Sequence, residues 1–293
     1  MPVKMIVVDI DGTLLPSAGT RISTRNMRAL REAEAAGLGI VIATGRRQAY
    51  AAPLIHPVEL RPETVLITSN GTVTRTLAGE PMDRFTLSVE TARALCPALR
   101  PWGATVFTFD REGPGEMVLE SLDDLHPRMA LWVEANRAFI REVRPLERAF
   151  DSGEAPVQGM VCGTVAEMRR AEEWLAASEL AARIEMHRTE YEARDLTILD
   201  VLPPGCSKGV ALLRLAQERG IAREEILAIG DNWNDLEMLE CAGQAVVMAN
   251  GAPDLVAEAQ RRGWAIAAPN DEDGVAQIVE SVLAGSRVSG MVE

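Results

Sequence analysis

The sequence contains several short apolar runs, and each of them is followed by a polar cluster. Met5–Val8 ends at Asp9, and Leu38–Ala43, Val65–Thr68 and Ile226–Ile229 have the same form. Runs of this length without polar alternation are typical of strands that are buried on both faces, as in a parallel sheet. Repeated runs of this kind predict an α/β fold built around one parallel sheet.

Helical segments separate these predicted strands. Ser23 precedes a predicted helix over Thr24–Ala36, which stops at Gly37, and Ser207 precedes another that runs to Arg219. Serine is a favoured first cap because its hydroxyl accepts a hydrogen bond from a free backbone amide, and glycine is favoured where a helix stops. A strand–helix–strand order with short connections predicts right-handed parallel crossovers.

The middle of the chain has a different pattern. Candidate strands such as Thr105–Phe109 and Met117–Glu120 come in neighbouring pairs, and helical stretches interrupt them. Clustered strands beside helices are typical of an α+β module. We therefore predict an α/β domain that is discontinuous, formed by residues 1–81 and 191–293, with a second, α+β domain inserted at residues 82–190.

The chain has 293 residues and a formal net charge of −13 at pH 7. Such acidity repels nucleic acid and anionic membranes, and no long run of Lys and Arg counters it. No stretch reaches the roughly 20 apolar residues that span a bilayer, and the first apolar run is too short for a signal peptide. The four cysteines are scattered, as in proteins of reducing compartments. We expect a cytoplasmic protein that binds neither nucleic acid nor membranes, and the sequence leaves its oligomeric state open.

Three polar clusters follow predicted strands: Asp9–Thr13, Thr44–Arg46 and Gly230–Asp235. In open parallel sheets, ligands bind beyond the carboxyl ends of the strands. Three clusters at such ends therefore predict one shared ligand site. The acidity of the chain repels a phosphorylated ligand at long range, so an anionic substrate would need a local positive group or a bound cation.

Four residues of these clusters are acids, namely Asp9, Asp11, Asp231 and Asp235. Asp9 and Asp11 share a face if the strand conformation continues past Val8. Carboxylates that lie close together raise each other's pKa unless a cation is present. The group therefore predicts a hard cation with oxygen ligands, and magnesium suits it best because it works with phosphate substrates. Taken alone, an Asp-x-Asp-Gly segment is as well explained by a strand-to-turn cap.

Two other positions indicate an anion site. Thr44 and Gly45 lie between a predicted strand and a plausible helix, where a hydroxyl and free backbone amides bind anions. Lys208 opens the helix that Ser207 caps, and it is placed to offset the carboxylates. Each has a simpler reading in isolation, a helix cap for the first and a solvated surface charge for the second.

With these motifs in this order, the chain resembles the haloacid dehalogenase superfamily of phosphohydrolases. The four motifs are Asp9–Leu15 (DIDGTLL), Val41–Arg46 (VIATGR), Ser207–Gly209 (SKG) and Gly230–Asp235 (GDNWND). The Ser69-Asn70-Gly71 turn, the large insert between the second and third motifs, and Asp273-Gly274-Val275 resemble the Cof-type branch, subfamily IIB, with a C2 cap. The resemblance covers the predicted core, implies that it is Rossmann-like, and extends to the cap in position and length only.

The resemblance also implies roles for single residues. Asp9 would be the nucleophile that forms an aspartyl-phosphate, and Asp11 the general acid and then the base. Thr44, Gly45 and Lys208 would hold the phosphate, and Asn234 would either touch the phosphate or position Asp235. Mg²⁺ would be bound by Asp9, by Asp11 through its backbone carbonyl and by Asp231, with Asp235 in support through water.

Together these features predict a magnesium-dependent phosphatase that hydrolyses a small phosphomonoester, a sugar phosphate being one candidate. A phosphomutase or phosphotransferase, which passes the phosphate to a sugar hydroxyl, carries the same motifs. A regulatory phospho-acceptor fits less well, because receiver domains are much shorter and have no cap. Dehalogenation also fits less well, because Asp11, Thr44 and Lys208 suit phosphate chemistry.

Overall fold

The computed structural model describes residues 2–285, which form two compact units. The core unit consists of the residues up to Asp83 and those from Ser207 onward, and the cap unit runs from Arg84 to Cys206. The insert thus ends later in the chain than the residue 190 expected from the sequence. The physical reason is strand β11 (Leu196–Leu202), which pairs with two strands of the cap and so belongs to its sheet.

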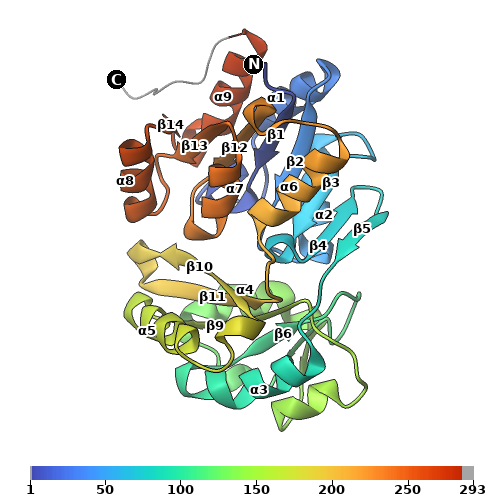
Figure 1. Ribbon diagram of the computed structural model, residues 1–293, viewed down its shortest axis with the longest axis vertical. Coiled ribbons are helices and arrows are strands. Elements are labelled where there is room, and N and C mark those ends of the chain that lie inside the picture. The colour runs from blue at the N-terminus through green and yellow to red at the C-terminus, as the bar shows by residue number, and fades with distance from the viewer. Residues whose placement is uncertain (1, 286–293) are drawn as a thin grey trace. The chain divides into compact units, whose positions relative to one another are not determined.

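A sheet of eight strands forms the centre of the described part of the core unit (Figure 1). The strand order is β14-β13-β12-β1-β2-β3-β4-β5, with parallel pairing from β14 to β3 and an antiparallel β3–β4 pair. The expected parallel sheet is confirmed. Its strands are β1 (Met5–Val8), β2 (Gly39–Ala43), β3 (Val65–Thr68), β4 (Val73–Thr76), β5 (Pro81–Arg84), β12 (Ile226–Gly230), β13 (Gln244–Met248) and β14 (Ala265–Ala267).

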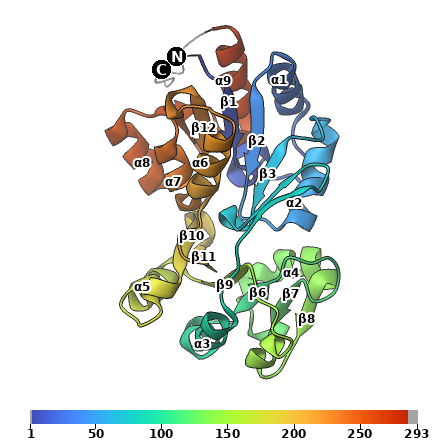
Figure 2. The same ribbon diagram turned by 45° about the vertical axis from the view of Figure 1, so that its right-hand side comes forward.

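Strand residues of the core sheet alternate between two apolar clusters, one on each face. Ile6 and Val8 of β1 belong to a cluster with α1, α2 and α9, whereas Met5 and Val7 belong to a cluster with α6, α7 and α8. Figure 2 shows these helices on either side of the sheet. Both faces are covered, which explains why the strands read as continuous apolar runs. The helices are α1 (Thr24–Ala35), α2 (Gln48–Ile55), α6 (Lys208–Glu218), α7 (Leu236–Cys241), α8 (Pro253–Arg262) and α9 (Gly274–Leu283).

The cap unit is built on a second sheet, with strand order β10-β11-β9-β6-β7-β8. Its pairs are antiparallel except β7–β8, and α3 and α5 pack on one face around Phe107, Val161 and Leu199. The α+β character expected for the insert is confirmed. Besides β11, its elements are β6 (Val106–Thr108), β7 (Met117–Leu119), β8 (Ile140–Glu142), β9 (Gln158–Gly163), β10 (Glu185–Tyr191), α3 (Val89–Leu99), α4 (Ala130–Asn136) and α5 (Val165–Ala176).

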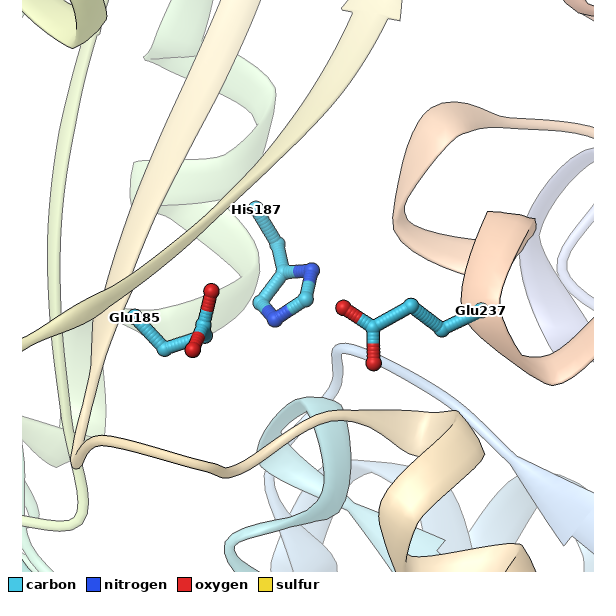
Figure 3. A group of neighbouring side chains, drawn as sticks. All are labelled: Glu185, His187 and Glu237. Atoms are coloured by element: carbon cyan, nitrogen blue, oxygen red, sulfur yellow. The ribbon is translucent and has the colours of Figure 1, made fainter. Parts of the chain in front are cut away.

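The opposite face of the cap sheet carries polar side chains on β10 and β11. Glu185 and His187 lie two residues apart on β10, and Figure 3 labels both side chains. His187 faces Asp200 across the β10–β11 pair, and Asp200 accepts a hydrogen bond of 2.5 Å from Gln158 Nε2. The Gln158–Asp200 hydrogen bond links β9 to β11 through polar side chains. Within residues 2–285, no helix is long and apolar enough to cross a membrane.

Candidate active site

The segments that follow β1, β2 and β12 emerge at one edge of the core sheet. Val8 pairs in parallel with Ile229 of β12 and with Ile42 of β2. Asp9 directly follows β1, and Asp231 directly follows β12. Because parallel neighbouring strands end at the same edge, these two acids enter the same part of the molecule.

Three carboxylates meet at this edge, those of Asp9, Asp231 and Asp235. One oxygen from each lies within 4.8 Å of the others, and all three residues are buried. Asp235 Oδ2 accepts hydrogen bonds from the backbone N–H of Asp231 at 3.0 Å and of Asn232 at 3.1 Å. The Asp235 side chain therefore binds the backbone of its own loop, and this fixes Asp231 and Asp235 relative to each other.

Lys208 binds two of these carboxylates. It is the first residue of α6, and the Ser207 hydroxyl caps that helix by accepting the backbone N–H of Val210 at 3.0 Å. Lys208 is 1% exposed, and its Nζ donates to Asp9 Oδ1 at 2.7 Å and to Asp235 Oδ1 at 2.6 Å. The alternative of a solvated surface charge is thereby excluded.

Burial dominates the electrostatics of the cluster. It raises the pKa of Asp9 to about 7, an effect that Lys208 opposes and Asp235 reinforces. Burial and the neighbouring Asp9 raise the pKa of Asp231 well above its usual range. Burial lowers the pKa of Lys208, but Asp235 and Asp9 together raise it above its ordinary value, so the lysine stays charged. One ammonium among three buried carboxylates leaves an excess of negative charge that favours a cation.

Asp231 is oriented from two sides. Thr13 Oγ1 donates to Asp231 Oδ1 at 3.0 Å. Gly12 has a φ of +71°, and a Cβ there would lie 2.2 Å from Asp231 Oδ2, so only glycine fits. Asn250 Nδ2 holds the same turn by donating to the carbonyl oxygen of Gly12 at 2.8 Å. A buried donor set made of carboxylate oxygens fits a hard divalent cation, and Asp9 and Asp231 are placed so that they could hold one.

The loop after β2 contains the predicted phosphate-binding residues Thr44 and Gly45. The Thr44 side chain is buried, and its Oγ1 accepts the backbone N–H of Arg46 at 3.1 Å. A Cβ on Gly45 would lie 3.1 Å from Asn70 Oδ1, and the same oxygen accepts a hydrogen bond of 3.1 Å from Asn234 Nδ2. Gly45 and Asn234 are thus brought together through Asn70, to which the sequence had assigned no role.

The Asp11 side chain does not join the carboxylate cluster. It is 38% exposed, and Arg46 donates from Nε to Asp11 Oδ2 at 2.7 Å and from Nη2 to Asp11 Oδ1 at 2.5 Å. The Arg46 guanidinium also lies 4.5 Å from the centre of the Tyr50 ring. A shared face for Asp9 and Asp11 required that the strand continue, but the strand ends at Val8 and a turn begins at Ile10.

The whole arrangement can be compared with known proteins. Residues 6–279 match the family model of the haloacid dehalogenase-like hydrolases. The chain belongs to this family. The family resemblance inferred from the four motifs is confirmed, and the match extends across the inserted cap as well as the core.

Several curated relatives and solved structures of the family match the chain over nearly its full length. Phosphatase YwpJ of Bacillus subtilis is 30% identical, over 96% of this chain and 100% of that protein. The 5-amino-6-(5-phospho-D-ribitylamino)uracil phosphatase YwtE of the same bacterium is 28% identical, over 96% and 99%. A haloacid dehalogenase-like hydrolase from Bacteroides thetaiotaomicron has a crystal structure that matches with a TM-score of 0.75 and 27% identity, over 96% and 99%. The chain is a phosphoric monoester hydrolase of this family.

Among the candidate residues of this haloacid dehalogenase-like hydrolase, Asp9, Lys208, Asp231 and Asp235 form one buried group. Sequence reasoning missed the partners of two others, Arg46 beside Asp11 and Asn70 beside Asn234. The sequence placed both residues at this edge of the sheet, but it did not indicate their partners. Arg46 and Asn70 each follow a buried strand of the same parallel sheet, and polar residues at that edge were the basis for choosing the other candidates.

Proposed function

We propose that the protein is a magnesium-dependent phosphatase that hydrolyses a small phosphomonoester through an aspartyl-phosphate on Asp9. The observation that carries this proposal is the buried Asp9 carboxylate, bound by Lys208 beside Asp231 and Asp235. A carboxylate in that position can act as a nucleophile, and a covalent intermediate splits one difficult displacement into two easier ones. The expected roles of the motif residues agree with this chemistry.

In the first step, an Asp9 carboxylate oxygen forms a bond to phosphorus and the bond from phosphorus to the leaving oxygen breaks. Asp11 gives its proton to that oxygen, so the product leaves as an alcohol. In the second step, a water oxygen forms a bond to the phosphorus of the aspartyl-phosphate while Asp11 takes the water proton, and the bond from phosphorus to the Asp9 oxygen breaks. Inorganic phosphate leaves, and both Asp9 and Asp11 return to their starting states.

Positive charge and hydrogen-bond donors must hold the transferred phosphoryl group, because it carries negative charge throughout. Lys208 supplies the ammonium, and Thr44, Gly45 and Asn234 supply hydroxyl, backbone amide and side-chain amide donors. Mg²⁺ would be held by Asp9, the backbone carbonyl of Asp11 and Asp231, with Asp235 in support through water. When bound, the ion neutralises part of the charge on the phosphoryl oxygens and the carboxylates.

A small phosphorylated metabolite is the proposed substrate. The name of the relative YwtE describes a phosphate carried on a ribityl chain, which is a phosphomonoester of a polyol. Its similarity over nearly the full length of both chains supports a sugar or polyol phosphate for this protein as well. The strongly acidic chain agrees with a site that depends on Lys208 and a cation to attract such an anion.

Turnover of phosphorylated metabolites by the purified protein tests this function. We expect inorganic phosphate release from sugar and polyol phosphates with Mg²⁺ and none with chelator. Asp9→Asn should abolish release, and Asp11→Asn should slow it by roughly 10²–10⁴-fold for alkyl phosphates. Unchanged turnover in Asp9→Asn would reject the mechanism. Adding free sugars separates a phosphotransferase from a phosphatase, because only the former gives a new sugar phosphate in place of phosphate.

A further inference from the structure

A strained turn follows β3. Ser69, Asn70 and Gly71 are buried, and all three have left-handed backbone conformations, with φ values of 48°, 54° and 97°. Left-handed non-glycine residues are uncommon, and two in succession are rarer still. Such a conformation persists only where the surroundings enforce it, and strained backbone of this kind clusters at functional sites.

The backbone of the turn is bonded to the loop after β2. The N–H of Ser69 donates to the carbonyl oxygen of Arg46 at 2.8 Å, and the N–H of Asn70 donates to that of Thr44 at 3.1 Å. These two bonds lie on either side of Gly45. The left-handed path of the turn therefore fixes the loop that carries two of the proposed phosphate-binding residues.

The side chain of Asn70 connects that loop to the segment after β12. Its Oδ1 accepts a hydrogen bond of 3.1 Å from Asn234 Nδ2, and it lies 3.1 Å from where a Gly45 Cβ would be. One of the two N–H groups of the Asn234 amide is thus committed to Asn70. The direction of the remaining N–H follows from that bond, because the amide group is planar.

Gly71 brings the turn against the start of α6. A Cβ at this position would lie 2.1 Å from the carbonyl oxygen of Ser207 and 3.0 Å from the backbone nitrogen of Lys208. Together with its left-handed φ, this contact admits only glycine. The turn therefore touches the segments that carry Thr44, Lys208 and Asn234, which come from three separate parts of the chain.

We propose that the Ser69–Gly71 turn is a positioning element for the phosphoryl-binding groups, in which Asn70 sets the orientation of the Asn234 amide. This inference rests on the proposed phosphatase function. Asn70 acts through Asn234 and the Gly45 loop, because its Oδ1 accepts the Asn234 amide and its backbone N–H donates to the Thr44 carbonyl oxygen. An element that holds three donors in register acts on catalysis by geometry, and displacement of a donor by about 1 Å can cost roughly 100-fold in rate.

The test compares Asn70→Gly with Glu59→Gly. Glycine adopts left-handed φ freely, so Asn70→Gly removes the carboxamide without disturbing the turn. Glu59 is also left-handed, with a φ of 60°, but its side chain lies on the surface in an ion pair with Arg31. We expect Asn70→Gly to lower kcat/KM for p-nitrophenyl phosphate by roughly 10–100-fold, and to reduce the rise in Tm caused by inorganic phosphate. Glu59→Gly should match the wild type in both measurements.

The combination with Asn234→Ala decides whether Asn70 acts through Asn234. We expect the Asn70→Gly effect to be much smaller in the Asn234→Ala background, because the amide it orients is gone. All variants are assayed below the lowest Tm of the set. An undiminished effect in that background, or wild-type kcat/KM in the single variant, overturns the proposal. Should the wild-type protein prove inactive on phosphomonoesters, the proposed function fails, and the phosphate-induced Tm shift still decides the role of the turn.

Discussion

The guanidinium of Arg46 binds both carboxylate oxygens of Asp11, the residue proposed to carry the proton. The bonds run from Nε to Oδ2 at 2.7 Å and from Nη2 to Oδ1 at 2.5 Å, and Tyr50 supports the guanidinium from its ring face. A bidentate ion pair fixes the plane of a carboxylate as well as its position. Under the proposed mechanism, Arg46 therefore fixes the position from which Asp11 exchanges a proton with the substrate.

Replacing Arg46 is therefore expected to affect proton transfer more than phosphoryl binding. We predict that Arg46→Ala slows hydrolysis of alkyl phosphates by roughly 10–100-fold, because Asp11 loses its fixed position. Hydrolysis of p-nitrophenyl phosphate should change little, because nitrophenolate leaves without a proton. Arg46→Lys should recover only part of the rate, since an ammonium lacks the planar fork. Steady-state kinetics on both substrates measure the difference.

The matched control is Arg31→Ala, which removes a guanidinium from the surface ion pair with Glu59. It should leave both substrates unaffected. Equal losses on the two substrates in Arg46→Ala would contradict the prediction, because they would place Arg46 in binding of the phosphate itself.

Lys208 carries a second prediction, because it is the positive group that bridges the Asp9 and Asp235 carboxylates. Lys208→Met leaves these acids buried without that partner, and breaking such a pair costs about 3–5 kcal/mol of unfolding free energy. Phosphatase activity should fall by roughly 100-fold or more through loss of a phosphoryl contact. Adding Asp235→Asn should restore part of the stability and none of the activity. Urea denaturation and initial rates report the two effects separately.

The ion pair of Lys4 with Glu225, in which the lysine is exposed to solvent, provides the comparison for Lys208. Lys4→Met should cost at most about 1 kcal/mol, as exposed ion pairs do. An equal loss of unfolding free energy in Lys4→Met and Lys208→Met would contradict the prediction, because it would show that burial does not increase the cost of removing Lys208.

The raised pKa of Asp9 makes stability depend on pH. Its pKa is about 7 in the fold and 3.8 ordinarily, because of burial, so the folded state binds more protons than the unfolded state between these values. Stability therefore falls as the pH rises through this window. We predict that in chelator the Tm decreases from pH 5 to pH 7.5, and that Mg²⁺ restores it by binding the folded state. Differential scanning calorimetry at fixed ionic strength measures both changes.

Two variants refine the pH experiment. Asp231→Asn removes a neighbouring charge, so the decrease in Tm between pH 5 and pH 7.5 should become smaller. Glu280 has a lowered pKa because Arg25 donates a hydrogen bond to it, so its titration lies below this range. Glu280→Gln should accordingly leave the pH dependence unchanged. A Tm that is independent of pH in chelator would contradict the raised pKa of Asp9.

The core was predictable from sequence where its elements are apolar on every face. The predicted strands Met5–Val8 and Val65–Thr68 have the bounds that the structure shows. The cap was less predictable, because β10 carries polar side chains on both faces and its partner β11 is recognised only by pairing. That pairing is a non-local property, and it moves the end of the cap unit to Cys206.

Some residues of the site could likewise be predicted from the sequence, and others could not. Acids at the ends of buried strands could be placed together because parallel strands end at one edge of a sheet. The Arg46–Asp11 pair could not, because it depends on the path of the backbone after Val8. The Ser69-Asn70-Gly71 turn was noticed in the sequence, but the contacts of Asn70 could not be predicted, since they depend on a left-handed conformation that sequence patterns do not specify.

Gly12 tests whether the shape of the first motif serves Asp231. Its φ is +71°, and Gly79, in the turn between β4 and β5, has a similar φ of +86° with no atom within 4 Å of the position of a Cβ. Alanine at either position carries a left-handed cost of roughly 1–2 kcal/mol, but only at Gly12 does the new methyl meet the Asp231 carboxylate. We predict that Gly12→Ala abolishes the Mg²⁺-induced rise in Tm and lowers activity by more than roughly tenfold, whereas Gly79→Ala lowers stability alone. Equal responses to Mg²⁺ in the two variants would show that Asp231 does not need the space that Gly12 leaves.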